Sequence, residues 1–152
     1  MIDGRPIIYE QIRIGYTGRK FKILKFRTMN NKIVKNEKLR LNKLGKLIRR
    51  LSLDEIPQFF NVLKKDMSIV GPRPLPELNE KKINKNFRIK RRSVLPGITG
   101  MSQINYTGKH RSLNEKVKLD LKFIKDYSIF NYFKILIKTP LVLIIRLLKN
   151  KY

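Results

Sequence analysis

Residues 52–63 read Ser-Leu-Asp-Glu-Ile-Pro-Gln-Phe-Phe-Asn-Val-Leu. Ser52 and Glu55 have the spacing of a capping box, in which the first and fourth residues of a helix start bond each other's backbone. The spacing therefore predicts a helix that begins here, and Pro57 is tolerated because it lies near the first turn. We expect this helix to turn its apolar side inward. That side carries Ile56, Phe59, Phe60 and Leu63.

Upstream of this segment, the pattern predicts a basic amphipathic helix over residues 37–51, with apolar residues at helical spacing. Further upstream, residues 7–14 and 19–28 are rich in Ile, Phe, Tyr and Thr and flank Gly15-Tyr16-Thr17-Gly18, which predicts a β-hairpin. The alternation in its second arm changes phase after Ile23, which suggests a bulge or a twist.

Downstream, Val70-Gly71-Pro72-Arg73-Pro74 predicts a stiff loop that presents one arginine, because two prolines fix the backbone around it. Residues 96–100 predict a turn, followed by a short strand over 101–105. Ser112 and Glu115 form a second capping box at the start of a helix. Together these elements predict an α+β (mixed α/β) fold, in which a small N-terminal β-hairpin packs with amphipathic helices in one domain over residues 1–152.

The most apolar part of the chain lies near its C-terminus, and we expect membrane-interface helices over residues 129–149. The prediction is of two helices, 131–138 and 140–149, with Thr139 as N-cap of the second. Cations rim their apolar faces, as in helices that lie on anionic lipid headgroups. An ordinary core-facing helix pair is the alternative. Neither this segment nor residues 1–5 matches a bilayer-spanning helix or a signal peptide.

Composition narrows the chemistry. Lys and Arg number 36 against 11 Asp and Glu, for a formal net charge of +25, which favours a polyanionic partner. The absence of cysteine excludes disulfides, thiolate metal sites and Cys nucleophiles, and His110 is the one histidine. We do not expect a nucleic-acid partner, because the aromatic residues Phe59, Phe60 and Phe133 fall at core spacing and do not predict a stacking platform.

Asp54 and Glu55 are the only acidic residues between Lys38 and Lys65. One interpretation is structural, since acids in a first turn complement the helix dipole and Glu55 completes the capping box. The other is chemical: two neighbouring carboxylates can hold Mg²⁺, and one of them can attack phosphorus. The second interpretation needs cations nearby, and Arg49, Arg50 and Arg73 are the candidates.

Three further cations have two interpretations each. Arg73 is either a binding residue or part of a plain turn. Lys25 and Arg27 are either phosphate ligands or charges on a solvated strand face.

Several motifs, in order, closely resemble the bacterial sugar transferase family, the monotopic polyprenyl-phosphate phosphoglycosyl transferases. The resemblance runs from about Ile7 to the C-terminus. It rests on Lys25-Phe26-Arg27-Thr28-Met29, Leu44-Gly45-Lys46-Leu47-Ile48-Arg49, residues 52–63, Asp66-Met67-Ser68-Ile69-Val70-Gly71-Pro72-Arg73-Pro74-Leu75, and Pro96-Gly97-Ile98-Thr99-Gly100.

This resemblance implies transfer of sugar 1-phosphate from a nucleotide-activated sugar, usually a UDP-sugar, to polyprenyl phosphate. It implies that Asp54 is the nucleophile that forms a covalent phosphosugar intermediate, and that Glu55, with Asp54, binds Mg²⁺. It assigns phosphate binding to Lys25, Arg49 and Arg73. The reaction would begin membrane glycan assembly (exopolysaccharide, capsule, lipopolysaccharide O-antigen or glycoprotein glycan) at the cytoplasmic face of the bacterial inner membrane, on an anionic membrane surface.

The chain departs from the family pattern in four places. Family members usually begin with a hydrophobic re-entrant helix, and we expect this chain to start just after the point where that helix ends. Lys65 stands where glycine is common, Met101 where an aromatic is common, and Tyr106-Thr107-Gly108 replaces a Gly-Arg-Asn-like run. A non-catalytic peripheral membrane relative, or a truncated fragment, is therefore the alternative function.

Overall fold

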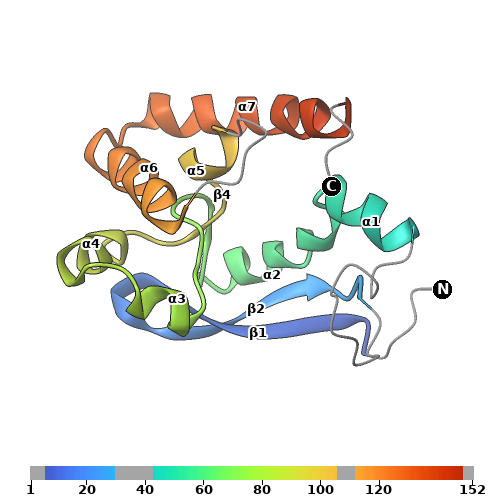
Figure 1. The fold of residues 1–152 in the computed structure, drawn as a ribbon, viewed down its shortest axis with the longest axis horizontal. Helices are drawn as coiled ribbons and strands as arrows, with labels where there is room; N and C mark the ends of the chain where they lie inside the picture. The colour runs from blue at the N-terminus through green and yellow to red at the C-terminus, as the bar shows by residue number, and fades with distance from the viewer. Residues whose placement is uncertain (1–5, 30–42, 106–111, 149–152) are drawn as a thin grey trace.

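The computed structural model describes residues 6–29, 43–105 and 112–148, and it confirms a mixed α+β fold (Figure 1). His110 and the 106–108 departure lie outside these ranges. The elements, with η for short 3₁₀ helices, are β1 (Ile8–Ile14), η1 (Tyr16–Gly18), β2 (Lys20–Phe26), α1 (Lys43–Arg50), η3 (Leu53–Glu55), α2 (Gln58–Leu63), β3 (Ser68–Val70), α3 (Glu77–Lys81), α4 (Lys85–Arg91), β4 (Gly97–Thr99), α5 (Met101–Ile104), α6 (Leu113–Lys125) and α7 (Ile129–Leu148).

The predicted hairpin is present as antiparallel β1 and β2. Their register runs unbroken from Ile8 opposite Phe26 to Ile14 opposite Lys20, so the bulge, one of the two expected irregularities, is wrong. Because side chains alternate along a strand, Lys25 lies on the same face of β2 as Phe21 and Ile23. Phe21 and Ile23 are core residues. The change of phase in the sequence pattern after Ile23 therefore reflects the replacement of an apolar residue by Lys25 on the inner face of the strand.

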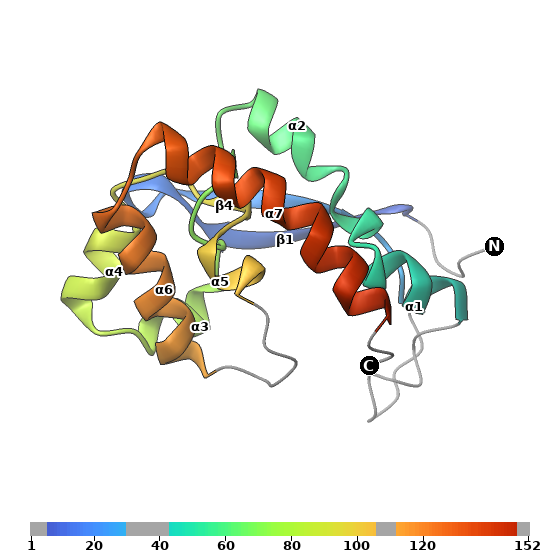
Figure 2. The ribbon, with the colours of Figure 1, turned by 90° about the horizontal axis from the view of Figure 1, so that it is seen from above.

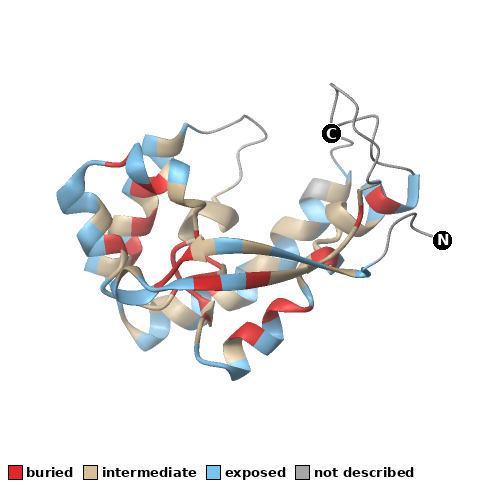
Figure 3. Cartoon of the chain, turned by 90° about the horizontal axis from the view of Figure 1, so that it is seen from below, coloured by how far each residue is buried: buried red, intermediate tan, exposed pale blue. Residues whose placement is uncertain are grey.

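Two small apolar clusters form the core, and β3 connects them. The first contains Phe21, Ile23 and Met67, and the second contains Val70, Phe123 and Ile135. Figure 3 shows the buried residues of the hairpin and of the helices that pack around it.

Residues 96–100, predicted as a turn, contain β4, which pairs in parallel with β3. Gly97 permits this pairing, because an added Cβ there would overlap the backbone nitrogen of Gly71. The strand expected over 101–105 is also wrong, since this segment forms α5. The capping box of Ser112 and Glu115 is confirmed at the start of α6.

The predicted capping box at 52–55 is wrong. Ser52 has left-handed backbone angles (φ 54°), and its side chain makes no cap hydrogen bond. Its N–H donates to Arg49 O, so Ser52 ends α1 in the manner of a left-handed C-terminal residue and does not start the next helix. A 3₁₀ turn follows, and α2 begins only at Gln58.

The predicted inner face of α2 is also reversed. Gln58 and Asn61 are its buried residues, whereas the apolar residues expected inside are exposed, namely Ile56, Phe59, Phe60 and Leu63. The reason lies in β2: the Asn61 amide donates to Lys22 O (2.8 Å) and accepts from Leu24 N (3.1 Å). Since these hydrogen bonds place the polar side of the helix against the strand, its apolar side faces outward.

The two helices predicted near the C-terminus are one helix, α7, that continues through Pro140. Thr139 is not an N-cap; its hydroxyl donates to Ile135 O (2.8 Å) and lies 2.9 Å from the hydroxyl of Thr99. Figure 2 shows α7 lying across the molecule. Ile135 is buried, but much of the opposite face is exposed, so one helix provides both a core face and an apolar surface. Among the described residues, no helix is both long and apolar enough to cross a membrane.

Candidate active site

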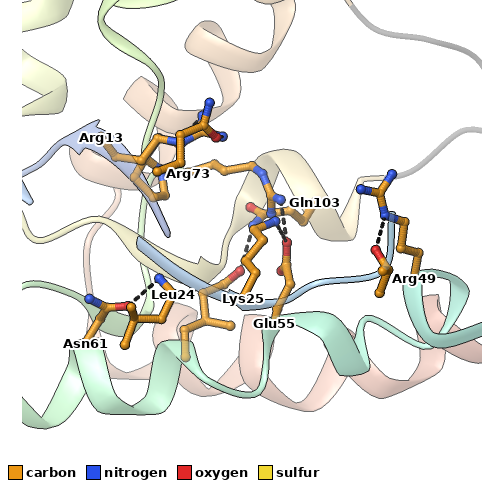
Figure 4. Close-up of polar contacts among 12 residues, drawn as sticks. Arg13, Leu24, Lys25, Arg49, Glu55, Asn61, Arg73 and Gln103 are labelled. Carbon is orange, nitrogen blue, oxygen red and sulfur yellow. Dashed lines mark hydrogen bonds and ion pairs between the residues drawn. The ribbon is translucent and has the colours of Figure 1, made fainter. Parts of the chain in front are cut away.

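Glu55 is the centre of the candidate site (Figure 4). Its Oε1 accepts from Lys25 Nζ at 2.7 Å and from Arg73 Nη2 at 2.6 Å. The three residues come from β2, η3 and the loop between β3 and α3, far apart in the sequence. The interpretation of Glu55 as a capping residue is therefore wrong, because its carboxylate is engaged by two cations.

These cations control the protonation of Glu55. Burial alone would raise the pKa of this carboxyl, whose side chain is 13% exposed. Arg73 and Lys25 outweigh burial through their charges and hydrogen bonds and lower the pKa to about 2. Glu55 is therefore a carboxylate at neutral pH and holds two cationic side chains in fixed positions.

At Asp54, burial outweighs the nearby cations, and the pKa is raised. Asp54 is 7% exposed, and burial raises its pKa, with a smaller contribution from the charge of Glu55. The charges of Lys25 and Arg49 act against this rise. A poorly solvated carboxylate is less stabilised as an anion, so bond formation to an electrophile is more favourable than it would be in water.

The remaining predicted cations occupy different surroundings. Arg49 Nε donates to the hydroxyl of buried Thr28 at 2.8 Å, which joins the end of α1 to the end of β2. Arg50 Nη2 donates to Leu147 O at 3.3 Å and links α1 to α7. Arg27 Nε donates to Pro6 O at 2.8 Å, and its guanidinium lies over the ring of Tyr9, which is opposite Lys25 in the hairpin register.

The residues present fit Mg²⁺ in donor type. Mg²⁺ in proteins is commonly held by one or two carboxylates, with substrate phosphates and waters as the other ligands. Asp54 and Glu55 supply two carboxylates. Within the described ranges, no larger group of His, Cys, Asp and Glu side chains with metal-site spacing is present. A metal ion would have to share Glu55 with Lys25 and Arg73.

Sequence reasoning missed the support of the site. Asn61 bonds the backbone of β2 on both sides of Ile23, next to Lys25 along the strand. The sequence contained a pattern that could have predicted this contact: Gln58 and Asn61 are polar residues three apart in an otherwise apolar helix, so they lie on one face of it. Figure 4 places Gln103 of α5 near the Glu55 cluster, and its Nε2 donates to Ile98 O at 2.9 Å.

Comparison with known proteins places this arrangement in a family. The family model described as bacterial sugar transferase matches residues 1–146. The chain is 42% identical to an uncharacterized sugar transferase, EpsL, of Bacillus subtilis (strain 168), over 90% of this chain and 69% of the relative. It is 40% identical to galactosyl transferase CpsE of Streptococcus agalactiae serotype III (strain NEM316), over 94% of this chain and 36% of the relative.

A third relative is the UDP-glucose:undecaprenyl-phosphate glucose-1-phosphate transferase of Escherichia coli (strain K12), 38% identical over 88% of this chain and 32% of the relative. The chain thus spans about a third of the length of two of these three relatives. Since the family model covers nearly the whole chain, the chain belongs to the bacterial sugar transferase family.

Proposed function

We propose that the protein transfers sugar 1-phosphate from a UDP-sugar to a polyprenyl phosphate, through a covalent phosphosugar on Asp54. The observation that carries this proposal is the placement of a buried carboxylate, Asp54, next to a carboxylate that is already paired with Lys25 and Arg73. The names of several relatives describe transfer of a sugar phosphate from a UDP-sugar to undecaprenyl phosphate.

The proposed reaction has two displacements at one phosphorus. First, an oxygen of Asp54 attacks the phosphorus that carries the sugar, the bond from that phosphorus to the oxygen of UMP breaks, and UMP leaves. Next, a phosphate oxygen of the polyprenyl phosphate attacks the same phosphorus, and Asp54 leaves as a carboxylate. The product is a polyprenyl-diphosphate sugar.

The role of the cations follows from the charges. A carboxylate and a diphosphate repel each other, and each displacement adds negative charge around phosphorus. Lys25, Arg49 and Arg73 lie around the two carboxylates and would offset that charge from fixed positions. Mg²⁺ held by Asp54 and Glu55 would supply further neutralisation of the diphosphate.

The proposed location is the cytoplasmic face of the bacterial inner membrane. Exposed apolar residues cover one side of α7 and of α2, among them Phe130, Phe133, Ile137, Leu141, Phe59, Phe60 and Leu63. Lys134 and Lys138 are exposed on α7 as well. An apolar face with cations beside it fits an anionic lipid surface, which also contains the proposed acceptor.

A labelling experiment tests the reaction. The chain is incubated with Mg²⁺, vesicles that contain polyprenyl phosphate, and each of several UDP-sugars radiolabelled in the sugar. We expect UMP release and a radiolabelled protein, both lost in Asp54→Asn. Asp126→Asn, at an exposed position after α6, is the matched control and should retain both signals. Normal turnover by Asp54→Asn would overturn the role of Asp54.

The second candidate is a non-catalytic peripheral membrane protein, which the exposed apolar face also fits. Tight binding to the same vesicles, with neither UMP release nor label from any UDP-sugar, would favour it.

A further inference from the structure

The loop that carries Arg73 is held by its own carbonyl groups. Four successive carbonyl oxygens, of residues 72–75, each accept a hydrogen bond from another part of the chain. The donors, in order, are Gly97 N (2.9 Å), Arg91 Nη2 (2.8 Å), Arg13 Nη1 (3.4 Å) and Ile14 N (3.1 Å). Pro72 and Pro74 have no N–H, so these acceptors are the main means by which the fold fixes the path of the loop.

The bond to Arg73 itself comes from a buried cation. The side chain of Arg91 is 4% exposed. Besides Arg73 O, its guanidinium donates to Glu80 Oε1 at 2.6 Å and to Asp120 Oδ2 at 3.1 Å. Arg91, at the end of α4, thereby joins α3 and α6 to one backbone carbonyl. Figure 1 shows these three helices at the same end of the molecule.

The geometry of this contact is specific to arginine. A guanidinium is planar and offers five N–H donors in a fixed fork, whereas a lysine ammonium is a compact point charge on a flexible stem. Glu80 and Asp120 occupy the donors on two sides of the Arg91 fork, and this fixes the direction of the third. That third direction leads to the carbonyl of Arg73, whose side chain reaches Glu55.

We propose that Arg91 is a positioning residue for the active site: it fixes the backbone of Arg73, so that the Arg73 guanidinium stays beside Glu55 and in place for the substrate phosphate. The part of this inference that concerns phosphate rests on the proposed function. The part that concerns the contact between Arg73 and Glu55 stands on the geometry alone. A buried ion pair without a positioning role would stabilise the fold and leave Arg73 unaffected.

Arg92 provides a matched comparison. It follows Arg91 in the chain and binds the same acid, with Nε 3.1 Å and Nη2 3.0 Å from Glu80 Oε2. Its side chain is 27% exposed, and its guanidinium is directed to Glu80. Loss of Arg92 therefore disturbs the same helix pair without removing the hydrogen bond to Arg73.

The first test is a double-mutant cycle on kcat/KM for UMP release. Arg91→Lys keeps the buried charge, and we expect it to lower kcat/KM roughly 10- to 100-fold, the scale of a small displacement of a binding group. In an Arg73→Lys background the same change should cost less than about threefold, because residues that act through one contact are not additive. Arg92→Gln should stay within about twofold of wild type. Equal losses in both backgrounds would overturn the inference.

The second test does not depend on activity. The Nε–H signal of Arg73 is assigned in ¹⁵N spectra of the full chain by its loss in Arg73→Lys. We expect the signal to shift or broaden in Arg91→Lys and to stay unchanged in Arg92→Gln. An unchanged signal in a folded Arg91→Lys would refute the positioning role.

A second variant covers the case in which Arg91→Lys does not fold. Arg91→Gln combined with Asp120→Asn removes two opposite charges together, and it should alter the Arg73 signal in the same way. If wild type releases no UMP, the proposed function fails, and the spectra alone decide this inference.

Discussion

Replacement of Glu55 by Gln tests the electrostatics of the site. Glutamine has nearly the shape of a protonated glutamate, so Glu55→Gln removes the charge with little change in packing. In the folded protein this charge is stabilised by Arg73 and Lys25, which outweigh burial and bring the pKa to about 2 from 4.5. We expect the variant to be less stable at neutral pH and to lose most of this deficit in acid.

The magnitude follows from linkage. A carboxyl whose folded pKa is depressed contributes stability above its unfolded pKa and loses it as the pH falls through the folded value. The shift from 4.5 to about 2 corresponds to about 3 kcal/mol at pH 7, at 1.36 kcal/mol per pKa unit. At pH 3 the folded carboxyl is still ionised but the unfolded one is mostly protonated, and the contribution falls to about 1 kcal/mol.

The assay is urea unfolding of wild type and Glu55→Gln at several pH values from 7 to 3, with EDTA present to keep the carboxylates free of metal ions. Glu10→Gln is the control, because Glu10 lies on the exposed side of β1 and pairs with an exposed lysine, Lys22. Its variant should differ from wild type by less than about 1 kcal/mol at pH 7. A Glu55→Gln deficit that is the same at pH 7 and pH 3 would refute the electrostatic account of the site.

Three further variants test the supporting structure by unfolding measurements. Lys65→Gly should stabilise the protein by about 1 kcal/mol, because Lys65 has a left-handed φ of 61°, whereas Lys64→Gly, at a right-handed position, should not. Asn61→Ala should destabilise the protein by about 2 kcal/mol, because it removes the two hydrogen bonds that the Asn61 amide makes to the backbone of β2. Asn114→Ala, at an exposed position of α6, is the control and should destabilise the protein by less than about 0.5 kcal/mol. Burial outweighs the partners of Asp120 and raises its pKa from 3.8 to about 6. Wild type should therefore lose roughly 2 kcal/mol of stability relative to Asp120→Asn between pH 4 and pH 7, and a constant difference would contradict that shift.

The parts of the fold that sequence patterns predict are those with a strong local signal. The hairpin has two β-rich arms around a glycine-containing turn, and α6 has a complete capping box, so both are found where expected. Residues 97–105 lack such a signal. Whether Ile98 lies in a strand depends on β3, which is distant in sequence, and on Gly97, which lets the two backbones approach.

The false capping box shows where local pattern fails. Ser52 and Glu55 have the required identities and spacing, but Ser52 ends the preceding helix in a left-handed conformation. The carboxylate of Glu55 then binds Lys25 and Arg73, which the chain brings together only in three dimensions. The motif contains both carboxylates of the candidate site, and its local interpretation gave Glu55 the wrong partner.

The reversed face of α2 connects the site to the outer surface. Gln58 and Asn61 must face β2, since their side chains are buried and Asn61 bonds that strand on both sides of Ile23. At 100° per residue, this orientation leaves Phe59, Phe60 and Leu63 on the outside.

The helix that holds Lys25 in place therefore also carries exposed apolar side chains directly after Asp54 and Glu55 in the chain. A lipid surface that covered those side chains would bring its phosphates close to the proposed nucleophile. Variants such as Phe60→Ser should therefore weaken both vesicle binding and turnover. A loss of only one of the two would show that these side chains and the active site act independently.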